Sequence, residues 1–440
     1  MKLVITLALA GALLLPAPAA AADTRPNIVV VMLDDVAADA VPGLLERLPQ
    51  MRSVWGRGLR FTDHYGNDPL CCPGRATFLT GLYDHHHGVI ENDGTRFDPS
   101  RTIATKLDSA GYHTAIAGKY LNGLADIPDK TPPGWDQLAI IASGYRDYDL
   151  WRDGVLEHHG SDAADYSTDV AAEAAVGFIA SAPAAAPLFL MLTPYGPHRG
   201  PAGDVWQPDP ADRHLTDARC DGLGKRRTPA WNDVTGKPSF IQAFPELPGD
   251  GWPLGPTCRT LLSVDEMVGR VKAALTKSGR WSDTVMILTA DNGMSWGDHR
   301  ERMKKVPWST PLPLYVRWDA AVGSAPRTRA AMTQMADMAP TLCEIGGCNI
   351  PGDGRSIVPE IMGATSGRDI FAERPTGDPA FPPWRSLRTA EGWHYVEWQG
   401  GERDLYDMTA DPWELDDLAG RSRYRRTLDD LAARLDAAAD

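Results

Sequence analysis

Side chains able to bind ions directly follow four short apolar runs of this 440-residue sequence. In chain order they are Asp34 with Asp35, Lys119, His198, and Asp291 with Asn292. Carboxylate and amide oxygens are ligands of hard cations such as calcium or magnesium, whereas lysine and histidine suit an anion. Each residue alone has an ordinary explanation as a helix cap, a turn or a solvated charge. Because all of these residues follow an apolar run, we instead predict a single site that binds both a cation and an anion.

The four apolar runs predict strands that are buried on both faces of a sheet. They are rich in branched side chains and cover residues 26–33, 112–117, 187–193 and 284–290. Helix-like stretches lie between them, for example at residues 102–111 and 261–279. Alternation of strand and helix predicts an α/β fold with a mainly parallel sheet. Because ligands bind beyond the carboxyl ends of such strands, we expect the site at that edge.

The composition is that of a globular protein, with 43% hydrophobic and 23% charged residues. Its formal net charge of −14 argues against nucleic acid or an anionic membrane as the main partner, although a local basic pocket can still hold a small anion. The length predicts one large domain, or a large domain with a smaller companion. Since the pattern changes after about residue 365, we expect these domains at residues 23–365 and 366–440.

The first 22 residues have a lysine, an apolar stretch and then small residues. This order is typical of a cleavable secretory signal peptide, so the mature chain is expected to start near Asp23. No other stretch approaches the roughly 20 apolar residues that a membrane-spanning helix needs. We therefore expect a secreted, soluble, extracellular protein with no membrane partner.

Export permits disulfide bonds among the six cysteines. The sequence does not fix the pairing, and the candidate pairs are Cys343 with Cys348 and Cys220 with Cys258. If these four residues pair, the adjacent Cys71 and Cys72 are left over. A leftover cysteine in an exported protein raises the question of reactive chemistry.

The segment around Cys71 resembles a known signature. Residues 71–81, "CCPGRATFLTG", are similar to the sulfatase motif C-x-P-S-R followed by a short helix that ends in T-G. Further segments resemble sulfatase motifs in family order: "NIVVVMLDD", "GYHTAIAGKYLNG", "PYGPH", "LTADNGMSWGDHR", "DGRSIVPEIMG" and "DLYDMTADPWELDDL". The resemblance implies an alkaline-phosphatase-like fold, in which helices sandwich a large, mainly parallel sheet beside a smaller C-terminal α+β subdomain.

In the sulfatase family the first cysteine of the motif is oxidised during export to a formylglycine aldehyde. The resemblance therefore makes Cys71 the precursor of formylglycine and implies a maturation enzyme as a partner. One hydroxyl of the hydrated aldehyde attacks the sulfate, and deprotonation of the other expels it afterwards. The implied ligands of one calcium ion are Asp34, Asp35, Asp291, Asn292 and the modified Cys71. The implied sulfate-binding residues are Lys119, His198 and Lys304, with Arg75 bracing the aldehyde hydrate.

Two choices within the motifs remain open. Lys304 is favoured over Lys305 because it lies four residues before the aromatic Trp308, as the family lysine does. His87 and His299 match motif histidines and are candidates for proton transfer, with a structural role as the alternative for each.

Two positions depart from the family pattern. Gly74 stands where the family has serine or another small polar residue, which predicts weaker recognition by the maturation enzyme. Trp308 and Ser309 replace a tyrosine and a glutamate, so that loop is expected to be shaped for another substrate.

The resemblance leans towards the branch that contains glucosamine-6-sulfatases and heparan 6-O-endosulfatases. The expected function is therefore calcium-dependent hydrolysis of sulfate monoesters, on a sulfated amino sugar or, as a surrogate, an aryl sulfate. The alternatives are a phosphodiesterase or phosphonate monoester hydrolase of the same superfamily, and a catalytically silent protein that binds sulfated glycans.

The long segment at residues 200–258 contains Trp206, Trp231 and Trp252. These side chains could stack on sugar rings or pack locally within the segment, and the sequence leaves both roles open.

Overall fold

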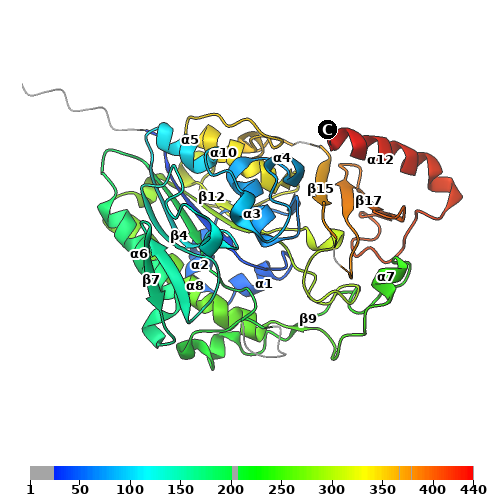
Figure 1. Cartoon of the computed structure of the whole chain (residues 1–440), viewed down its shortest axis with the longest axis horizontal. Coiled ribbons are helices and arrows are strands. Elements are labelled where there is room, and N and C mark those ends of the chain that lie inside the picture. Colours follow the sequence, from blue (N-terminus) through cyan, green and yellow to red (C-terminus); the bar gives the residue numbers. More distant parts are fainter. Residues whose placement is uncertain (1–23, 201–206, 366, 378, 440) are drawn as a thin grey trace, which may run out of the picture.

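A ten-stranded sheet forms the centre of the larger part of the molecule (Figure 1). The structure is a computed structural model that describes residues 24–200, 207–365, 367–377 and 379–439, so the expected signal peptide and Trp206 lie outside the described residues. In spatial order the strands are β13 (Arg327–Arg329), β2 (Leu59–Phe61), β12 (Leu314–Arg317), β11 (Thr284–Ala290), β1 (Asn27–Leu33), β8 (Leu188–Thr193), β4 (His113–Lys119), β5 (Gln137–Ile141), β6 (Tyr148–Arg152) and β7 (Val155–His159).

The four predicted strands are β1, β4, β8 and β11, and they lie next to one another in the sheet. Every residue of β1, β8 and β11 is buried, as expected for strands covered on both faces. The strands are parallel, and Leu33 at the end of β1 pairs with Ala290 at the end of β11. This register places the residues that follow β1 and β11 side by side at the carboxyl edge.

Helices cover both faces of this sheet (Figure 1). On one face, α6 packs on β4 and contacts α8, and α8 in turn contacts α2. On the other face, α5 packs on β4 and contacts α10, and α10 in turn contacts α3. The helices are α1 (Val41–Leu45), α2 (Pro49–Trp55), α3 (Cys71–Thr80), α4 (Asp84–His87), α5 (Ile103–Ser109), α6 (Ser167–Ser181), α7 (Ser239–Gln242), α8 (Gly255–Lys277), α9 (Asp319–Val322), α10 (Met338–Ile345), α11 (Val358–Met362) and α12 (Arg425–Ala438). Within the described ranges, no helix combines the length and apolarity needed to cross a bilayer.

A second, antiparallel sheet forms the C-terminal part of the chain. Its strands, in order, are β15 (Ile370–Arg374), β16 (Trp384–Arg388), β17 (Trp393–Trp398) and β18 (Arg403–Asp407). Leucines of α12 pack on this sheet because Leu428, Leu431 and Leu435 share one helix face and meet buried residues such as Tyr395. The predicted α/β class with a small C-terminal α+β unit is confirmed, while the boundary at residue 365 stays a prediction.

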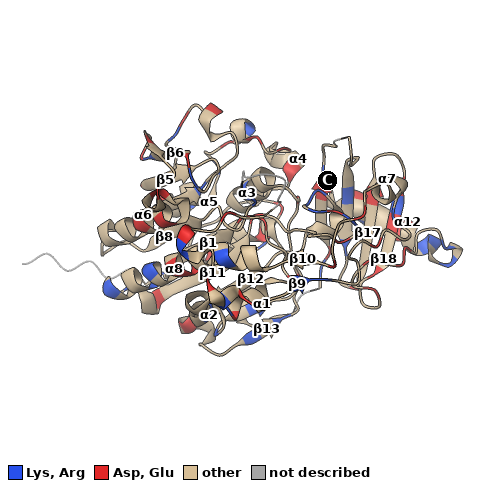
Figure 2. Cartoon of the chain, turned by 90° about the horizontal axis from the view of Figure 1, so that it is seen from below, with Lys and Arg blue, Asp and Glu red and all other residues tan. Residues whose placement is uncertain are grey.

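The long segment before α8 runs between the two sheets. It contains β9 (Lys225–Arg226), β10 (Trp252–Pro253) and α7, and both views show β9 between the larger body and the C-terminal sheet (Figures 1 and 2). Lys237 in this segment donates a hydrogen bond to the hydroxyl of Tyr406 on β18, at 3.0 Å. The remaining strands form two short pairs: β9 pairs with β10, and β3 (His64–Tyr65) pairs with β14 (Thr333–Gln334).

Both candidate disulfide bonds are present. Cys220 is bonded to Cys258, which ties the long segment to the first turns of α8. Cys343 is bonded to Cys348 at the end of α10. Cys71 and Cys72 are buried free cysteines, so the pairing leaves over the two residues that the sequence singled out.

Candidate active site

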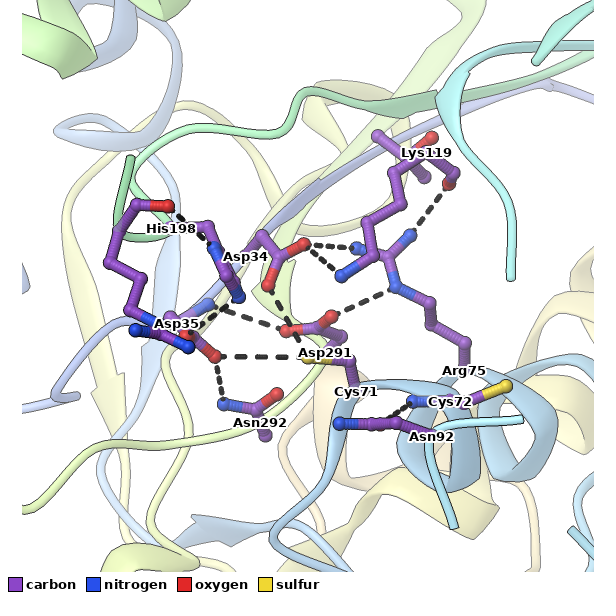
Figure 3. A network of polar contacts seen from close by, with 12 residues as sticks. Asp34, Asp35, Cys71, Cys72, Arg75, Asn92, Lys119, His198, Asp291 and Asn292 are labelled. Carbon is purple, nitrogen blue, oxygen red and sulfur yellow. Dashed lines mark hydrogen bonds and ion pairs between the residues drawn. The ribbon is translucent and has the colours of Figure 1, made fainter. Parts of the chain in front are cut away.

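Acidic and cationic side chains meet at the carboxyl edge of the large sheet (Figure 3). Asp34 and Asp35 follow β1, Asp291 follows β11, and Cys71 is the first residue of α3. Ligand atoms of Asp34, Asp35, Cys71 and His198 all lie within 4.8 Å of one another. The expected convergence of these side chains is therefore present in the structure.

Helix α3 presents two site residues on one face, because Cys71 and Arg75 are four positions apart. Arg75 is fully buried and bridges two aspartates: Nε donates to Asp291 at 2.8 Å and Nη2 to Asp34 at 3.3 Å. Its Nη1 donates to the backbone carbonyl of Lys119 at 2.6 Å. Arg75 thus fixes α3 to β4 and to the residues that follow β1 and β11.

Two buried lysines complete the cluster. Lys119 Nζ donates to Asp34 Oδ2 at 2.6 Å. Lys304 Nζ contacts Asp35, lies 2.9 Å from Cys71 Sγ and donates to Asn292 Oδ1 at 3.0 Å. The structure thus places Lys304, and not Lys305, beside Cys71.

His198 lies at the rim of the cluster, with Nε2 3.4 Å from Asp35 Oδ2. Its side chain is 16% exposed, whereas Asp34, Asp35 and Lys119 are at most 2% exposed. Solvent therefore reaches the cluster on the His198 side.

Electrostatic effects within the cluster are strong because water is excluded. Burial raises the pKa of Asp34, but Lys119, His198 and Arg75 outweigh burial and hold that pKa below its usual value. Burial and the charge of Asp34 raise the pKa of Asp291 despite the ion pair with Arg75. Burial also raises the pKa of the Cys71 thiol above its usual value, although Lys119 and Lys304 oppose that shift.

The donor set fits a hard divalent cation. Asp34, Asp35 and Asp291 contribute carboxylate oxygens, and Oδ2 of Asp35 is buried without a hydrogen bond among the described residues, although His198 Nε2 lies 3.4 Å away. Three carboxylates face three cationic side chains, Arg75, Lys119 and Lys304, so the cluster is close to neutral by itself. A bound divalent cation would therefore give the site the positive charge that an anionic ester requires.

The two motif histidines are engaged elsewhere. His87 accepts a hydrogen bond from the Val89 amide, and its Nε2 lies 3.1 Å from the Thr77 hydroxyl and 3.3 Å from Asp84. His299 directs its two ring nitrogens at the carbonyls of Asp233 and Trp413, at 2.7 and 3.1 Å.

Burial lowers the pKa of His299 to about 3 and that of His87 to about 4. Burial therefore favours the neutral form of both rings, whereas the two carbonyls that face His299 favour its protonated form. Proton transfer by His87 or His299 stays a prediction, and these contacts favour the structural alternative for each.

Gly74 brings α3 against the end of β11. A Cβ atom at this position would lie 2.2 Å from the backbone oxygen of Asp291, a distance that real Cβ atoms do not adopt. In this structure the close contact between residue 74 and the Asp291 backbone oxygen therefore favours glycine at position 74.

We expect Gly74→Ala to destabilise the protein by about 1–3 kcal/mol, because the added methyl group overpacks the contact with Asp291. Displacing α3 by about 1 Å should also reduce turnover per matured molecule by about 100-fold. Thermal unfolding and turnover normalised to the aldehyde content of residue 71 measure the two effects.

Gly177→Ala is the matched control, because Gly177 is also helical but its Cβ would have open space. Alanine there should be neutral or stabilising. A Gly74→Ala protein as stable and active as the unmodified protein would contradict the packing role of Gly74.

The sequence identified only some of the residues around the mouth of the site. A narrow pocket at Asp35 is lined by Met294, Trp296, Met303, Arg199 and Trp252. The rings of Trp252 and Trp296 are stacked with centroids 5.9 Å apart. Trp252 was a candidate for sugar stacking or local packing, and Trp296 and Met294 lie in the motif that follows the fourth strand.

Trp231 lies apart from this mouth. Its ring packs so closely on Gly297 that a Cβ there would lie 2.0 Å from the ring. Local packing, and not an open stacking face, is therefore the observed environment of this side of the Trp231 ring.

A parallel α/β sheet with this carboxylate and cation cluster at its carboxyl edge defines an enzyme that acts on an anionic ester. The family model described as Sulfatase matches residues 26–348. The chain belongs to the sulfatase family and is a sulfuric ester hydrolase.

Individual relatives agree with this assignment. The N-acetylglucosamine-6-sulfatase of Capra hircus is 28% identical, in an alignment covering 92% of this chain and 84% of that protein. A solved structure described as a complex with its substrate D-glucosamine-2-N,6-O-disulfate has a TM-score of 0.78 at 21% identity, covering 94% of this chain and 97% of that one. The phosphonate monoester hydrolase from Silicibacter pomeroyi has a TM-score of 0.70 at 22% identity, covering 94% and 95%. The two structural likenesses show the fold alone.

Proposed function

We propose that this sulfatase is exported and hydrolyses 6-sulfate monoesters of amino sugars, with calcium and a formylglycine derived from Cys71. The observation that carries the proposal is the position of Cys71 Sγ, 3.6 Å from Asp34 and 2.9 Å from Lys304. The names of the relatives support the amino sugar, since the chain spans most of an N-acetylglucosamine-6-sulfatase. The secretory pattern of residues 1–22 and the two disulfide bonds support export.

The cation would be held by Asp34, Asp35, Asp291 and Asn292 together with residue 71. When bound, it would act as a Lewis acid on a sulfate oxygen. Oxidation of Cys71 to the aldehyde by a formylglycine-generating maturation enzyme, followed by addition of water to that aldehyde, would supply a hydroxyl nucleophile in place of the thiol.

The chain's own side chains bind and orient the ester. Lys119 and Lys304 are held beside residue 71 and offset negative charge on the sulfate oxygens. His198 is on the solvent side and its Nδ1 donates to the Arg199 carbonyl at 2.9 Å, so the protonated ring can donate from Nε2 to the bridging oxygen of the leaving alcohol. Arg75 does not reach the ester in this account; it fixes Asp34 and Asp291.

Turnover of nitrophenyl sulfate compared with nitrophenyl phosphate, a phosphate diester and a phosphonate monoester tests the reaction class. We expect kcat/KM to be highest for the sulfate. A higher kcat/KM for any of the phosphorus esters would favour the phosphodiesterase or phosphonate monoester hydrolase function and overturn the proposal.

Removal of divalent cations with a chelator should abolish turnover and lower the thermal unfolding temperature. Restoring calcium at about 100 times its dissociation constant should stabilise the folded state by about 2.7 kcal/mol. Asp35→Asn should lose most of this stabilisation, because Asp35 contributes a carboxylate to the cluster. An unfolding temperature that does not respond to chelator or to calcium would contradict the cation site.

A further inference from the structure

A cavity of about 290 Å³ lies between the carboxyl edge of the large sheet and the C-terminal sheet. Tyr65 and Trp308 come from the large domain, whereas Arg388, Trp413 and Glu414 come from the C-terminal part. The volume is near the lower end of the range for small-molecule sites, which suits one sugar ring. Three aromatic side chains in the lining, Tyr65, Trp308 and Trp413, offer apolar surface to the CH groups of such a ring.

The cavity adjoins the active site. Met294 lines both this cavity and the narrow pocket that contains Asp35. Trp308 lies four residues after Lys304, and its ring contacts the His299 ring with centroids 4.9 Å apart. The alcohol portion of an ester bound beside Cys71 would therefore extend past Met294 into the cavity.

The charged groups of the lining are mainly acidic. The carboxylates are Asp39, Asp63, Asp298 and Glu414, and the guanidinium groups are Arg226 and Arg388. Both ring nitrogens of His299 face backbone carbonyls, of Asp233 and Trp413, so neither nitrogen is available to bind an anion.

Both arginines are already paired. Arg226 binds Asp39 and Asp298 with contacts of 2.8 Å each, and Arg388 binds Glu414 at 3.0 Å. Among the described lining residues, every guanidinium group is thus engaged by a carboxylate of the same cavity. A second sulfate or a carboxylate on the bound sugar would meet repulsion there without a cation to receive it.

We propose that this cavity is the subsite for the sugar ring of the substrate, and that it selects a ring with neutral or amino substituents over a ring with a second anionic group. The proposal rests on the proposed function and adds to it the charge of the accepted sugar. Asp39 and Asp63 are the residues that exclude the second anion, since both line the cavity, where Asp39 is exposed and Asp63 is half-buried.

Calorimetric titration of the Cys71→Ala protein in calcium buffer tests the proposal, because this variant binds sugars without hydrolysing them. The ligands are N-acetylglucosamine-6-sulfate and glucosamine-2-N,6-O-disulfate. We expect the monosulfate to bind at least ~10-fold more tightly than the disulfate. Equal or tighter binding of the disulfate, or no binding of either sugar, would overturn the proposal.

Asp39→Asn and Asp63→Asn, each in the Cys71→Ala background, should reduce this preference about threefold or more, because each removes one negative charge from the cavity. The matched control is Asp319→Asn. Asp319 is paired with Arg317 at 2.6 Å and is 38% exposed, as Asp39 is paired with Arg226 and 43% exposed, but Asp319 does not line the cavity. The control should leave the preference unchanged, and an unchanged preference in both cavity variants would also overturn the proposal.

Hydrolysis of nitrophenyl sulfate by the protein with Cys71 intact separates the two proposals. This substrate carries neither a sugar nor a second anionic group, so its turnover does not depend on the charge preference that is proposed for the cavity. Loss of this activity would count against the proposed function, whereas the ratio of sugar affinities reports on the cavity. Asp319→Asn in the protein with Cys71 should hydrolyse nitrophenyl sulfate at the unmodified rate, since Asp319 lines neither the pocket at Asp35 nor the cavity.

Discussion

Cys71→Ala should reduce the turnover of sulfate esters by about 10⁴-fold or more, because it removes the precursor of the nucleophile. The fold should persist, since alanine keeps helix α3 intact and Cys71 forms no disulfide bond. Rates with nitrophenyl sulfate and thermal unfolding of the same preparation measure the two parts of this prediction.

Cys72→Ala is the matched control for this variant. Cys72 is also a buried free cysteine in the first turn of α3, but its recorded partner is Asn92, whose Oδ1 accepts from the Cys72 backbone amide at 3.0 Å. That bond survives the substitution, so activity should stay within about threefold of the unmodified protein. Near-normal turnover by Cys71→Ala would rule out residue 71 as the nucleophile.

Arg75→Met should have the second largest effect, on both stability and turnover. Arg75 is 1% exposed and pairs with Asp34 and Asp291, so its loss leaves two buried carboxylates without this partner. Breaking a buried ion pair in this way costs about 3–5 kcal/mol. We also expect kcat to fall by about 100-fold, because Asp34, Asp291 and α3 are no longer held in register.

Arg213→Met is the control variant that tests whether burial of the ion pair causes the large effect of Arg75→Met. Arg213 also forms a two-pronged pair with Asp169, at 2.7 Å for each contact, but its side chain is 39% exposed. Its replacement should change stability by about 0–1 kcal/mol and leave kcat unchanged. Equal losses in the two variants would show that the charge cluster contributes no more than a surface pair.

Sequence patterns predicted the centre of the fold because the central strands are buried on both faces. Strands β1, β8 and β11 consist only of buried residues, so each stands out as a short apolar run. In a parallel sheet such strands end at the same edge, which is why the positions of Asp34 and Asp291 were predictable before their contact was seen.

Contacts formed by irregular segments were not predictable in the same way. The segment around Lys237 has no period, and nothing local in it indicates that Lys237 reaches Tyr406 of the C-terminal sheet. The environments of His87 and His299 depend on single hydrogen bonds to Thr77 and to backbone carbonyls. Motif position suggested chemistry for these histidines, whereas local hydrogen bonding determines where their rings lie.

The contact of Gly74 is a second feature that could not be predicted from the sequence. The sequence identified Gly74 as a departure from the family pattern and predicted a consequence for maturation, which stays a prediction. The reason for the glycine lies 217 positions along the chain, at the backbone oxygen of Asp291. Such a contact between distant segments becomes visible only when α3 and β11 are placed together.

The mass of the tryptic peptide that spans residues 61–75 tests the central claim most directly. In protein produced with an active maturation enzyme, we expect this peptide to be lighter than its sequence requires, by the difference between a thiol-bearing and an aldehyde-bearing side chain at residue 71. Turnover of nitrophenyl sulfate should rise in proportion to that lighter species. A preparation that hydrolyses the sulfate while Cys71 remains entirely a free thiol would contradict the account.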